Sequence, residues 1–389
     1  MDTLVLLTTS MLLSGNFDSW DFLKQDEKYC IEPQTIKELK DIKDRNSNII
    51  NQKKAAMALS FIYHNIDSID FKTHTSKINK DLRVYAADIG SYLELIQIYK
   101  NVVLYEPKER DVIPTFSRAK AEIIESSKYN SDNPLNLKVN QYFILNYEEG
   151  IDFLYKVNEN LTYAPVPYQI LENDYFGKIK PKKNDARQLA AVDSLSNNQL
   201  TMLTGRAGTG KSYLALGALF SKLQKHEIDR IYMFCNPVAT RDSARLGFYA
   251  GTKDEKLLDS QVGNFLDGKI GDRVEVERLM REGKLQLLPM SDIRGFDSNG
   301  KKAGIYITEA QNSTIDLMQL ALERVGEDCV CIIDGDYKKQ VDLDVYSDIN
   351  NGMRRISQIY LGQNFYGEVH LKNVYRSRIA ALAAQMTTE

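Results

Sequence analysis

One segment, residues 205–212, constrains the fold of this 389-residue chain most strongly, because it fits the pattern G-x-x-x-x-G-K-[ST]. It follows an apolar strand candidate at 199–204 and opens a helix candidate at Lys211, which is the context that a phosphate-binding loop requires. Glycines let the backbone curl so that its N–H groups point at phosphates, and the start of the helix favours an anion. The alternative is a glycine-rich turn without a ligand.

The loop predicts an ATP site. Lys211 supplies a point charge for the β- and γ-phosphates, and Ser212 offers its hydroxyl to Mg²⁺. Gln188, upstream of the loop, is a candidate to read adenine through its amide.

From about residue 181 the pattern predicts an α/β fold with a mostly parallel sheet, because near-continuous apolar strands alternate with helical stretches. The expected strands are 199–204, 230–235, 284–290, 304–308, 329–334 and 368–371. We find no internal repeat.

A P-loop enzyme also needs acidic groups on a neighbouring strand. Glu309 follows the 304–308 strand and is placed to orient or deprotonate water and to hold metal. Thr308 stands where an Asp usually helps to hold Mg²⁺; it can reach the ion only through water and carries no charge. The expected metal site is therefore Ser212, Glu309 and, weakly, Thr308. Glu309 as a simple helix cap is the alternative.

Further polar residues are candidates to respond to the γ-phosphate. Asp336 and Gln340 follow the 329–334 strand, where a turn of Asp-Gly type is the alternative. Arg376 and Arg324 are candidates to stabilise the transition state, in the same chain or from a neighbouring subunit. The predicted nucleotide-binding residues are Gln188, Gly205, Arg206, Ala207, Gly208, Thr209, Gly210, Lys211, Ser212 and Asp336, and the predicted catalytic residues are Lys211, Glu309, Arg376, Arg324 and Gln340.

The order of these motifs resembles the PhoH-like ATPases, especially the form fused to an N-terminal PIN nuclease domain. The resemblance runs from about Phe176 to the C-terminus. It rests on segments that match the family's adenine-side stretch, phosphate loop, Leu-Gly-Phe signature, Arg-Gly step, Glu-Ala-Gln-Asn motif, Arg-x-Gly step, Gly-Asp-x-x-Gln motif and final arginine: 176–188, 205–215, 245–256, 293–295, 309–312, 323–326, 335–340, 351–353 and 376–377.

This resemblance implies a RecA-like core related to superfamily-one helicases. It also implies a ring-forming homo-oligomer, often a hexamer, that couples ATP hydrolysis with Mg²⁺ to the handling of single-stranded RNA, with DNA as the alternative polymer. Arg376 becomes the preferred γ-phosphate arginine. The chain departs from the family at Thr308, at Asn236, where Arg is usual, and at Tyr249-Ala250, which replaces a Leu/Tyr-Pro pair. These departures concern how tightly the protein binds its substrate and how fast it hydrolyses ATP.

The N-terminal region, expected at 1–125, resembles a PIN domain, whose clustered acids bind Mn²⁺ or Mg²⁺. Thr8 stands where the first catalytic Asp would be, and Glu38 stands at the second acid position. Asp81 and Asp88 are the candidates for the third acid, with Asp81 taken into the predicted site. We therefore expect a PIN-like α/β domain with a degraded metal site, followed by a linker or small β module at 126–180 and the ATPase domain at 181–389. An unrelated α/β domain is the alternative.

Composition leaves the function open. A net charge of −3 requires neither a nucleic-acid nor a membrane partner, and no apolar stretch is long enough to span a bilayer. Four cysteines without a zinc spacing favour a cytoplasmic setting. The leading hypothesis is an RNA-acting ATPase. A nucleotide switch with little hydrolysis and an ATP-gated ribonuclease are the alternatives.

Overall fold

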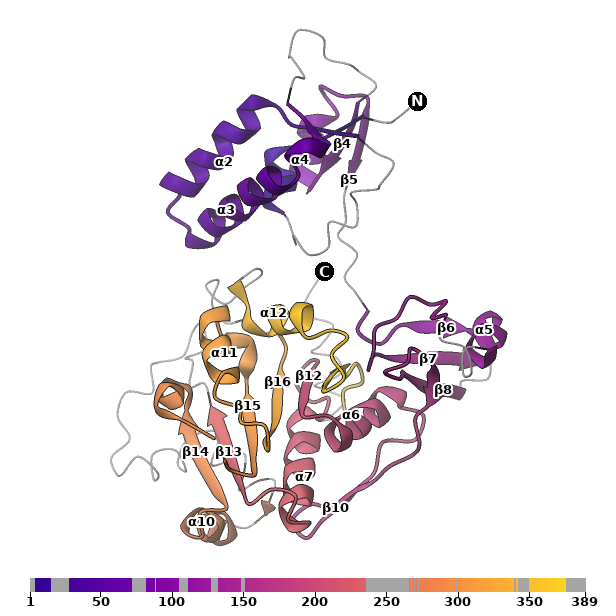
Figure 1. Ribbon diagram of the computed structural model, residues 1–389, viewed down its shortest axis with the longest axis vertical. Coiled ribbons are helices and arrows are strands. Elements are labelled where there is room, and N and C mark those ends of the chain that lie inside the picture. Colours follow the sequence, from indigo (N-terminus) through magenta and orange to yellow (C-terminus); the bar gives the residue numbers. More distant parts are fainter. Residues whose placement is uncertain are drawn as a thin grey trace. The chain divides into compact units, whose positions relative to one another are not determined.

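The computed structural model describes residues 4–14, 28–71, 82–87, 89–104, 111–126, 132–147, 151–235, 266, 268, 270–271, 273–298, 300–338, 341 and 350–375 (Figure 1). The chain divides into two compact units, Met1–Arg110 and Asp111–Glu389. The observed division between Arg110 and Asp111 therefore lies 15 residues before the boundary at residue 125 that we expected from the sequence.

The first unit is an α/β layer around a five-stranded parallel sheet with the order β3-β2-β1-β4-β5. Its strands are β1 (Leu4–Leu6), β2 (Lys28–Cys30), β3 (Ile69–Asp70), β4 (Arg83–Ala86) and β5 (Asn101–Leu104). Its helices are α1 (Thr9–Leu13), α2 (Pro33–Arg45), α3 (Ile49–His64), the short η2 (Ile66–Ser68) and α4 (Ile89–Leu95). Apolar residues such as Leu7, Leu12 and Leu39 fill the core between the sheet and α1–α3.

The second unit begins with a small β module. Its sheet has the order β6-β7-β8-β9, and a hairpin of β10 and β11 follows. The elements are β6 (Thr115–Ser117), η3 (Arg118–Lys120), α5 (Ala121–Ser126), β7 (Tyr142–Tyr147), β8 (Ile151–Val157), β9 (Tyr163–Pro165), β10 (Leu171–Asn173) and β11 (Gly177–Ile179). Because β6 pairs with β7, residues 115–117 belong to this module and not to the N-terminal unit.

A six-stranded sheet follows, with the order β14-β13-β15-β16-β12-β17 and every pairing parallel. The strands are β12 (Leu200–Thr204), β13 (Arg230–Cys235), β14 (Leu285–Pro289), β15 (Ala303–Thr308), β16 (Val330–Gly335) and β17 (Tyr366–His370). They correspond to the expected strands, and the mostly parallel α/β class is confirmed.

Helices cover both faces of this sheet (Figure 1). Residues of α6 (Ala186–Asn197) and α7 (Lys211–Gln224) pack with Leu203 and Tyr306 on one face. Residues of α11 (Ile315–Leu322) and α12 (Gly352–Ile359) pack with Met202 and Ile305 on the other. Successive strand residues thus enter opposite cores, as the pleat requires. The remaining elements are α10 (Arg273–Arg281), η4 (Met290–Gly295) and η5 (Ala310–Asn312).

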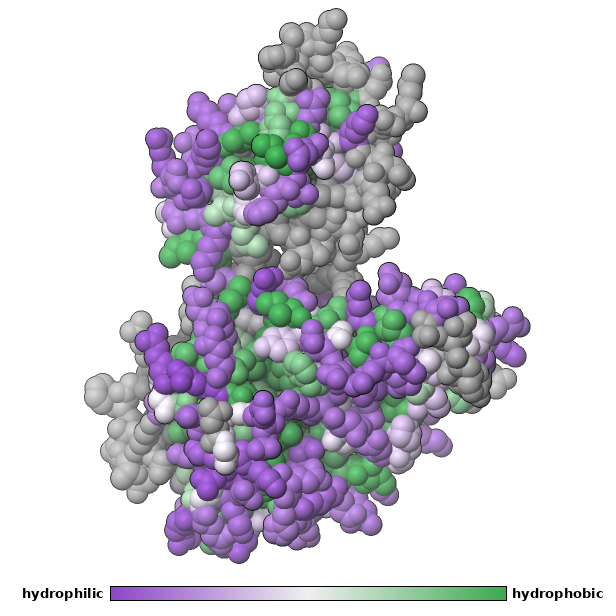
Figure 2. Space-filling model, in the orientation of Figure 1, coloured by the Kyte–Doolittle hydropathy of each residue, from purple (hydrophilic) through white to green (hydrophobic). Residues whose placement is uncertain are grey.

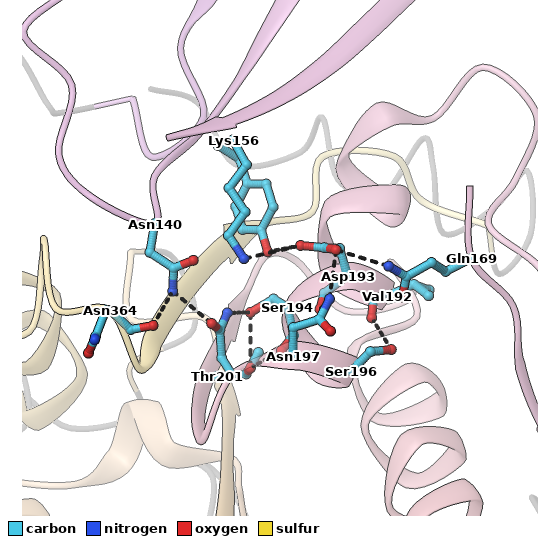
Figure 3. Close-up of polar contacts among 12 residues, drawn as sticks. Asn140, Lys156, Gln169, Val192, Asp193, Ser194, Ser196, Asn197, Thr201 and Asn364 are labelled. Carbon is cyan, nitrogen blue, oxygen red and sulfur yellow. Dashed lines mark hydrogen bonds and ion pairs between the residues drawn. The ribbon is translucent and has the colours of Figure 1, made fainter. Parts of the chain in front are cut away.

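Buried polar contacts fix the β module to α6 (Figure 3). Asp193 on α6 accepts hydrogen bonds from Tyr142 Oη at 2.6 Å and Gln169 Nε2 at 3.1 Å, and Lys156 Nζ lies 3.4 Å away. Asn140 Nδ2 donates to Asn198 Oδ1 at 2.7 Å and to the Tyr366 carbonyl at 2.6 Å. Because α6 precedes β12 and the phosphate loop, these contacts attach the β module to the part of the ATPase sheet that carries the loop.

Replacement of Asn140 by alanine is expected to lower the free energy of unfolding by about 1–3 kcal/mol, because buried acceptors lose their donor. Urea denaturation would measure this change. The control is Asn146→Ala, since Asn146 is exposed and bonds Asp152 within the same sheet. The control should stay within about 0.5 kcal/mol of wild type. Equal effects of the two substitutions would contradict a stabilising role for the buried contact.

The face of the molecule shown in Figure 2 is mostly hydrophilic, with apolar residues in separate groups. Among the described helices, none combines the length and apolar character that crossing a bilayer would require.

Candidate nucleotide-binding site

The strand order brings four loops to one edge of the ATPase sheet. Strand β16 lies between β12 and β15, and β17 lies on the other side of β12. Because all these strands are parallel, the segments that follow them meet at their carboxyl ends. The phosphate loop, the segment after Thr308, the segment after Gly335 and residues 371–375 are therefore neighbours.

The phosphate loop has a backbone that only glycine adopts readily. Gly205, Gly208 and Gly210 have φ of +137°, +84° and +97°. A side chain at Gly205 would also approach the Leu371 carbonyl to 2.3 Å. Gly210 precedes the first residue of α7, and no side chain caps this helix end, so its first N–H groups are directed at the loop.

Lys211 lies inside this loop. Its Nζ donates to the carbonyls of Gly205 at 2.6 Å and Arg206 at 3.1 Å. Thr209 Oγ1 also bonds the Arg206 carbonyl, at 2.9 Å, and so closes the turn that contains Ala207. The arrangement holds a positive charge and a helix terminus at one point, which suits a polyphosphate.

Asp334, at the end of β16, contacts this loop directly. Ser212 Oγ and Tyr306 Oη each donate to Asp334 Oδ2 at 2.9 Å, and the Glu309 N–H donates to Oδ1 at 3.3 Å. The Asp334 residue is 2% exposed. Sequence reasoning did not include it among the site residues; its signal was the Asp-Gly-Asp sequence that ends this strand.

Tyr306 remains a hydrogen-bond donor in this cluster. Burial and the neighbouring Asp334 carboxylate raise the pKa of its phenol well above 10. The hydroxyl therefore keeps its proton at physiological pH and donates a hydrogen bond to Asp334.

Glu309 leaves β15 in a left-handed conformation, with φ of +52°. This conformation is uncommon for residues with a side chain, and it turns the chain sharply at the sheet edge. Gln311 Nε2 donates to Glu309 Oε2 at 2.7 Å, and Gln311 Oε1 accepts from the Asp336 N–H at 3.3 Å. Gln311 thus connects the Glu309 side chain to the Asp336 backbone. Thr308, buried, ends β15 beside Cys235.

Residues near the start of α6 and in the segment 371–375 form a second side of the site. Gln188, near the start of α6, accepts from the Lys182 N–H at 2.9 Å, and its Nε2 lies 3.8 Å from the position of a side chain at Gly210. Tyr375 donates its N–H to the Gly208 carbonyl at 2.9 Å, and its hydroxyl bonds Asp185, the cap of α6. Sequence reasoning missed Tyr375 and Asp185, because this contact joins distant segments.

Residues 178–387 match the family described as PhoH-like protein, and this segment is more than half of the chain. The chain belongs to the PhoH-like protein family. The family is of the nucleotide-binding NTPase type, in agreement with the phosphate loop just described.

Three relatives illustrate the similarity. A PhoH-like protein of Mycobacterium tuberculosis strain H37Rv is 31% identical over 183 residues, which cover 46% of this chain and 50% of that protein. Protein PhoH2 of Bacillus subtilis is 29% identical over 226 residues, 56% of this chain and 49% of that protein. A PhoH-like protein of Bacillus subtilis is 29% identical over 285 residues, 71% and 74% of the two chains. The chain thus spans about half the length of the first two.

ATP and Mg²⁺, which the PhoH-like family implies, fit these residues. The curled loop and Lys211 suit phosphates, and the Ser212 hydroxyl with the Asp334 carboxylate forms the oxygen donor set that Mg²⁺ prefers.

Arg324 is not placed at this PhoH-like site within one chain. Ser298 Oγ bonds the Arg324 carbonyl, and Gln199 Nε2, just before β12, bonds the Glu327 carbonyl at 2.7 Å. Arg324 therefore lies near the amino end of β12, and the phosphate loop lies at the carboxyl end, about 16 Å away for a five-residue strand. Arg324 therefore does not lie beside the phosphate loop of its own chain.

Several expected residues lie outside the described part of the chain. They are Asp81, Asp88, Gln340 and Arg376, together with the 245–256 signature, Asn236 and Tyr249-Ala250. Their roles remain predictions.

In the N-terminal unit, Glu38 lies beside the carboxyl end of β1. It shares a surface pocket with Thr8 and accepts from Thr9 Oγ1 at 2.5 Å and Gln34 Nε2 at 3.1 Å. Within the described ranges, no group of three or more His, Cys, Asp or Glu is arranged to hold a metal. The PhoH-like match begins at residue 178 and does not cover this unit.

His370 is a titratable residue beside the phosphate loop, and its pKa makes the stability of the folded protein depend on pH. Its Nδ1 lies 2.9 Å from Thr204 Oγ1, directly before the phosphate loop. Burial, with the positive charges of Lys338 and Arg187, lowers the pKa of His370 from 6.5 to about 4.

Between pH 6.5 and 4 the unfolded chain therefore binds a proton at His370 that the folded chain does not, so the folded state loses stability as pH falls. We expect His370→Gln to show a shallower decrease of unfolding free energy across this window than wild type. Denaturant titrations at pH 7.5, 5.5 and 4.5 would measure it. Parallel curves for the two proteins would contradict the lowered pKa.

Proposed function

We propose that this PhoH-like chain is an ATPase motor that binds ATP with Mg²⁺ and uses its hydrolysis to move along or remodel single-stranded RNA. The observation that carries the proposal is the phosphate loop, with Lys211 inside it and Ser212 bonded to the acidic edge formed by Asp334 and Glu309. A structural turn has no need of a lysine and a buried carboxylate at this point.

Each residue has a role in this proposal. Lys211 and the loop amides bind the phosphates and stabilise the charge that develops on them. Glu309, held by Gln311, orients and deprotonates the attacking water. Gln188 and Tyr375 line the side of the base. Asp336 passes the state of the site, through Gln311 and Asn351, to helix α12.

We further propose that the chain forms a homo-oligomeric ring, a hexamer by resemblance, in the cytoplasm. The position of Arg324 supports the ring, because this arginine can reach a phosphate only on a neighbouring subunit. The four cysteines are buried thiols, which suits a reducing compartment. Light scattering with ATP and Mg²⁺ would test assembly, and a monomer would contradict it.

The N-terminal unit is proposed as a PIN-like module that binds RNA or cleaves it weakly. Its parallel sheet and the position of Glu38 beside Thr8 support this reading. Mn²⁺-dependent cleavage of RNA by the full chain, lost in Glu38→Gln, would establish cleavage. Absence of both cleavage and Glu38-dependent binding would contradict a nucleic-acid role.

The central test is ATP turnover with and without single-stranded RNA, using single-stranded DNA as a second polymer. The proposal predicts turnover that rises with RNA concentration and is lowered by about 100- to 1,000-fold in Lys211→Ala. Nucleotide binding without turnover would instead favour the nucleotide-switch function. Stimulation by DNA alone would reassign the substrate.

A further inference from the structure

We propose that Asp334 supplies the magnesium-binding carboxylate that position 308 lacks, so that the charge comes from strand β16 instead of β15. The inference rests on the proposed ATP binding. It concerns the one residue in the Glu-Ala-Gln-Asn region, Thr308, that departs from the acid expected there.

The sheet register places the two positions side by side. Ile307 on β15 pairs with Ile333 on β16, so the next residues, Thr308 and Asp334, lie level on neighbouring strands. Adjacent strands lie about 4.8 Å apart. Both positions share a face with Tyr306 and Ile332, which pack on the side of α7. A carboxylate at 334 therefore differs from one at 308 by a single strand spacing.

The Ser212–Asp334 hydrogen bond is the contact that a magnesium-holding acid should make. In P-loop NTPases, Mg²⁺ is held by the loop's Ser or Thr together with an Asp from a neighbouring strand. Here the Ser212 hydroxyl already donates to Asp334 at 2.9 Å, across 122 positions of sequence. Strand β16 pairs directly with β12, the strand that carries the loop, so this acid can reach Ser212.

The charge of Asp334 also requires a partner. A buried carboxylate is costly unless it is paired with a cation or fully hydrogen-bonded. Its hydrogen-bond donors are neutral: two hydroxyls and one N–H. In the described ranges, Asp334 forms no ion pair, and Lys211 is directed to the loop carbonyls. A divalent cation beside Ser212 would compensate this charge.

The experiment measures the affinity of full-length protein for a fluorescent ATP analogue in Mg²⁺ and in EDTA. Wild type should bind more tightly with Mg²⁺. Asp334→Asn should lower the Mg²⁺-dependent gain in affinity by about 10- to 100-fold, as loss of a metal-site partner does, with little change in EDTA. Moving the charge back in Thr308→Asp/Asp334→Asn should restore much of the gain.

Two variants separate this role from a structural one. Tyr306→Phe removes a donor to Asp334 but keeps the charge, so it should retain the Mg²⁺-dependent gain. Glu368→Gln is the matched control, because Glu368 is a buried carboxylate that also accepts from a serine and a tyrosine, Ser357 and Tyr366, on the far side of β12. It should bind as wild type does.

The outcomes are distinct. An unchanged Mg²⁺-dependent gain in Asp334→Asn would overturn the inference while leaving ATP binding intact. If that variant does not fold, a gain in Tyr306→Phe that vanishes completely would overturn it as well, because the charge alone would then be insufficient. No binding by wild type in either buffer would instead overturn the proposed function.

Discussion

Replacement of Lys211 by alanine is expected to lower ATP turnover by about 100- to 1,000-fold, the usual cost of removing one preorganised charge from a transition state. The Lys211 ammonium lies within the loop, 2.6 Å from the Gly205 carbonyl and 3.1 Å from the Arg206 carbonyl. Under the proposed function, this ammonium would bind the β- and γ-phosphates of ATP, which an alanine side chain cannot do. Phosphate release at saturating Mg²⁺, ATP and RNA would measure the change.

The control for this prediction is Lys225→Ala. Lys225 is exposed and caps the opposite end of the same helix, α7. It should turn over ATP as wild type does, so a general effect of lost positive charge can be separated from one at the site. Near-normal turnover in Lys211→Ala would mean that the loop is not the hydrolytic centre.

The Glu309→Gln substitution should slow the hydrolysis of bound ATP by about 100- to 10,000-fold, because a general base is lost. The amide preserves the size of the side chain and can still bond Gln311, so affinity for ATP should change little. Turnover and equilibrium binding measured on one preparation would show the split.

Glu327→Gln is the matched control for Glu309→Gln, since Glu327 is exposed and lies before β16, at the other edge of the sheet. It should leave both measurements unchanged. Loss of ATP affinity in Glu309→Gln, in proportion to the loss of turnover, would assign Glu309 to binding and not to the attack of water.

Features encoded within short segments were predictable from the sequence. The phosphate loop combines a strand, a fixed glycine spacing and a helix start, and each depends on residues close together in the chain. The ATPase strands followed from their apolar runs. The position of Glu309 at the end of a strand was predictable because it directly follows such a run. The structure connects it to Asp336 through Gln311.

Features that depend on strand order were not predictable in this way. The contacts of Asp334 follow only from the position of β16 between β12 and β15, because the partners Ser212 and Tyr306 are remote in sequence. The contact of Tyr375 with Asp185 is likewise formed across 190 positions. The first unit ends at Arg110 and not at the expected residue 125. A strand of three residues such as β6 shows no recognisable pattern in the sequence, and only its pairing with β7 assigns it to the β module.

Calorimetric titration of ATP with Mg²⁺ into the protein tests most directly whether the phosphate loop binds nucleotide. We expect saturable binding at one site per chain, which is abolished or greatly weakened in Lys211→Ala and retained in Lys225→Ala. Heats no larger than dilution at millimolar ATP, or equal binding by Lys211→Ala and wild type, would contradict it.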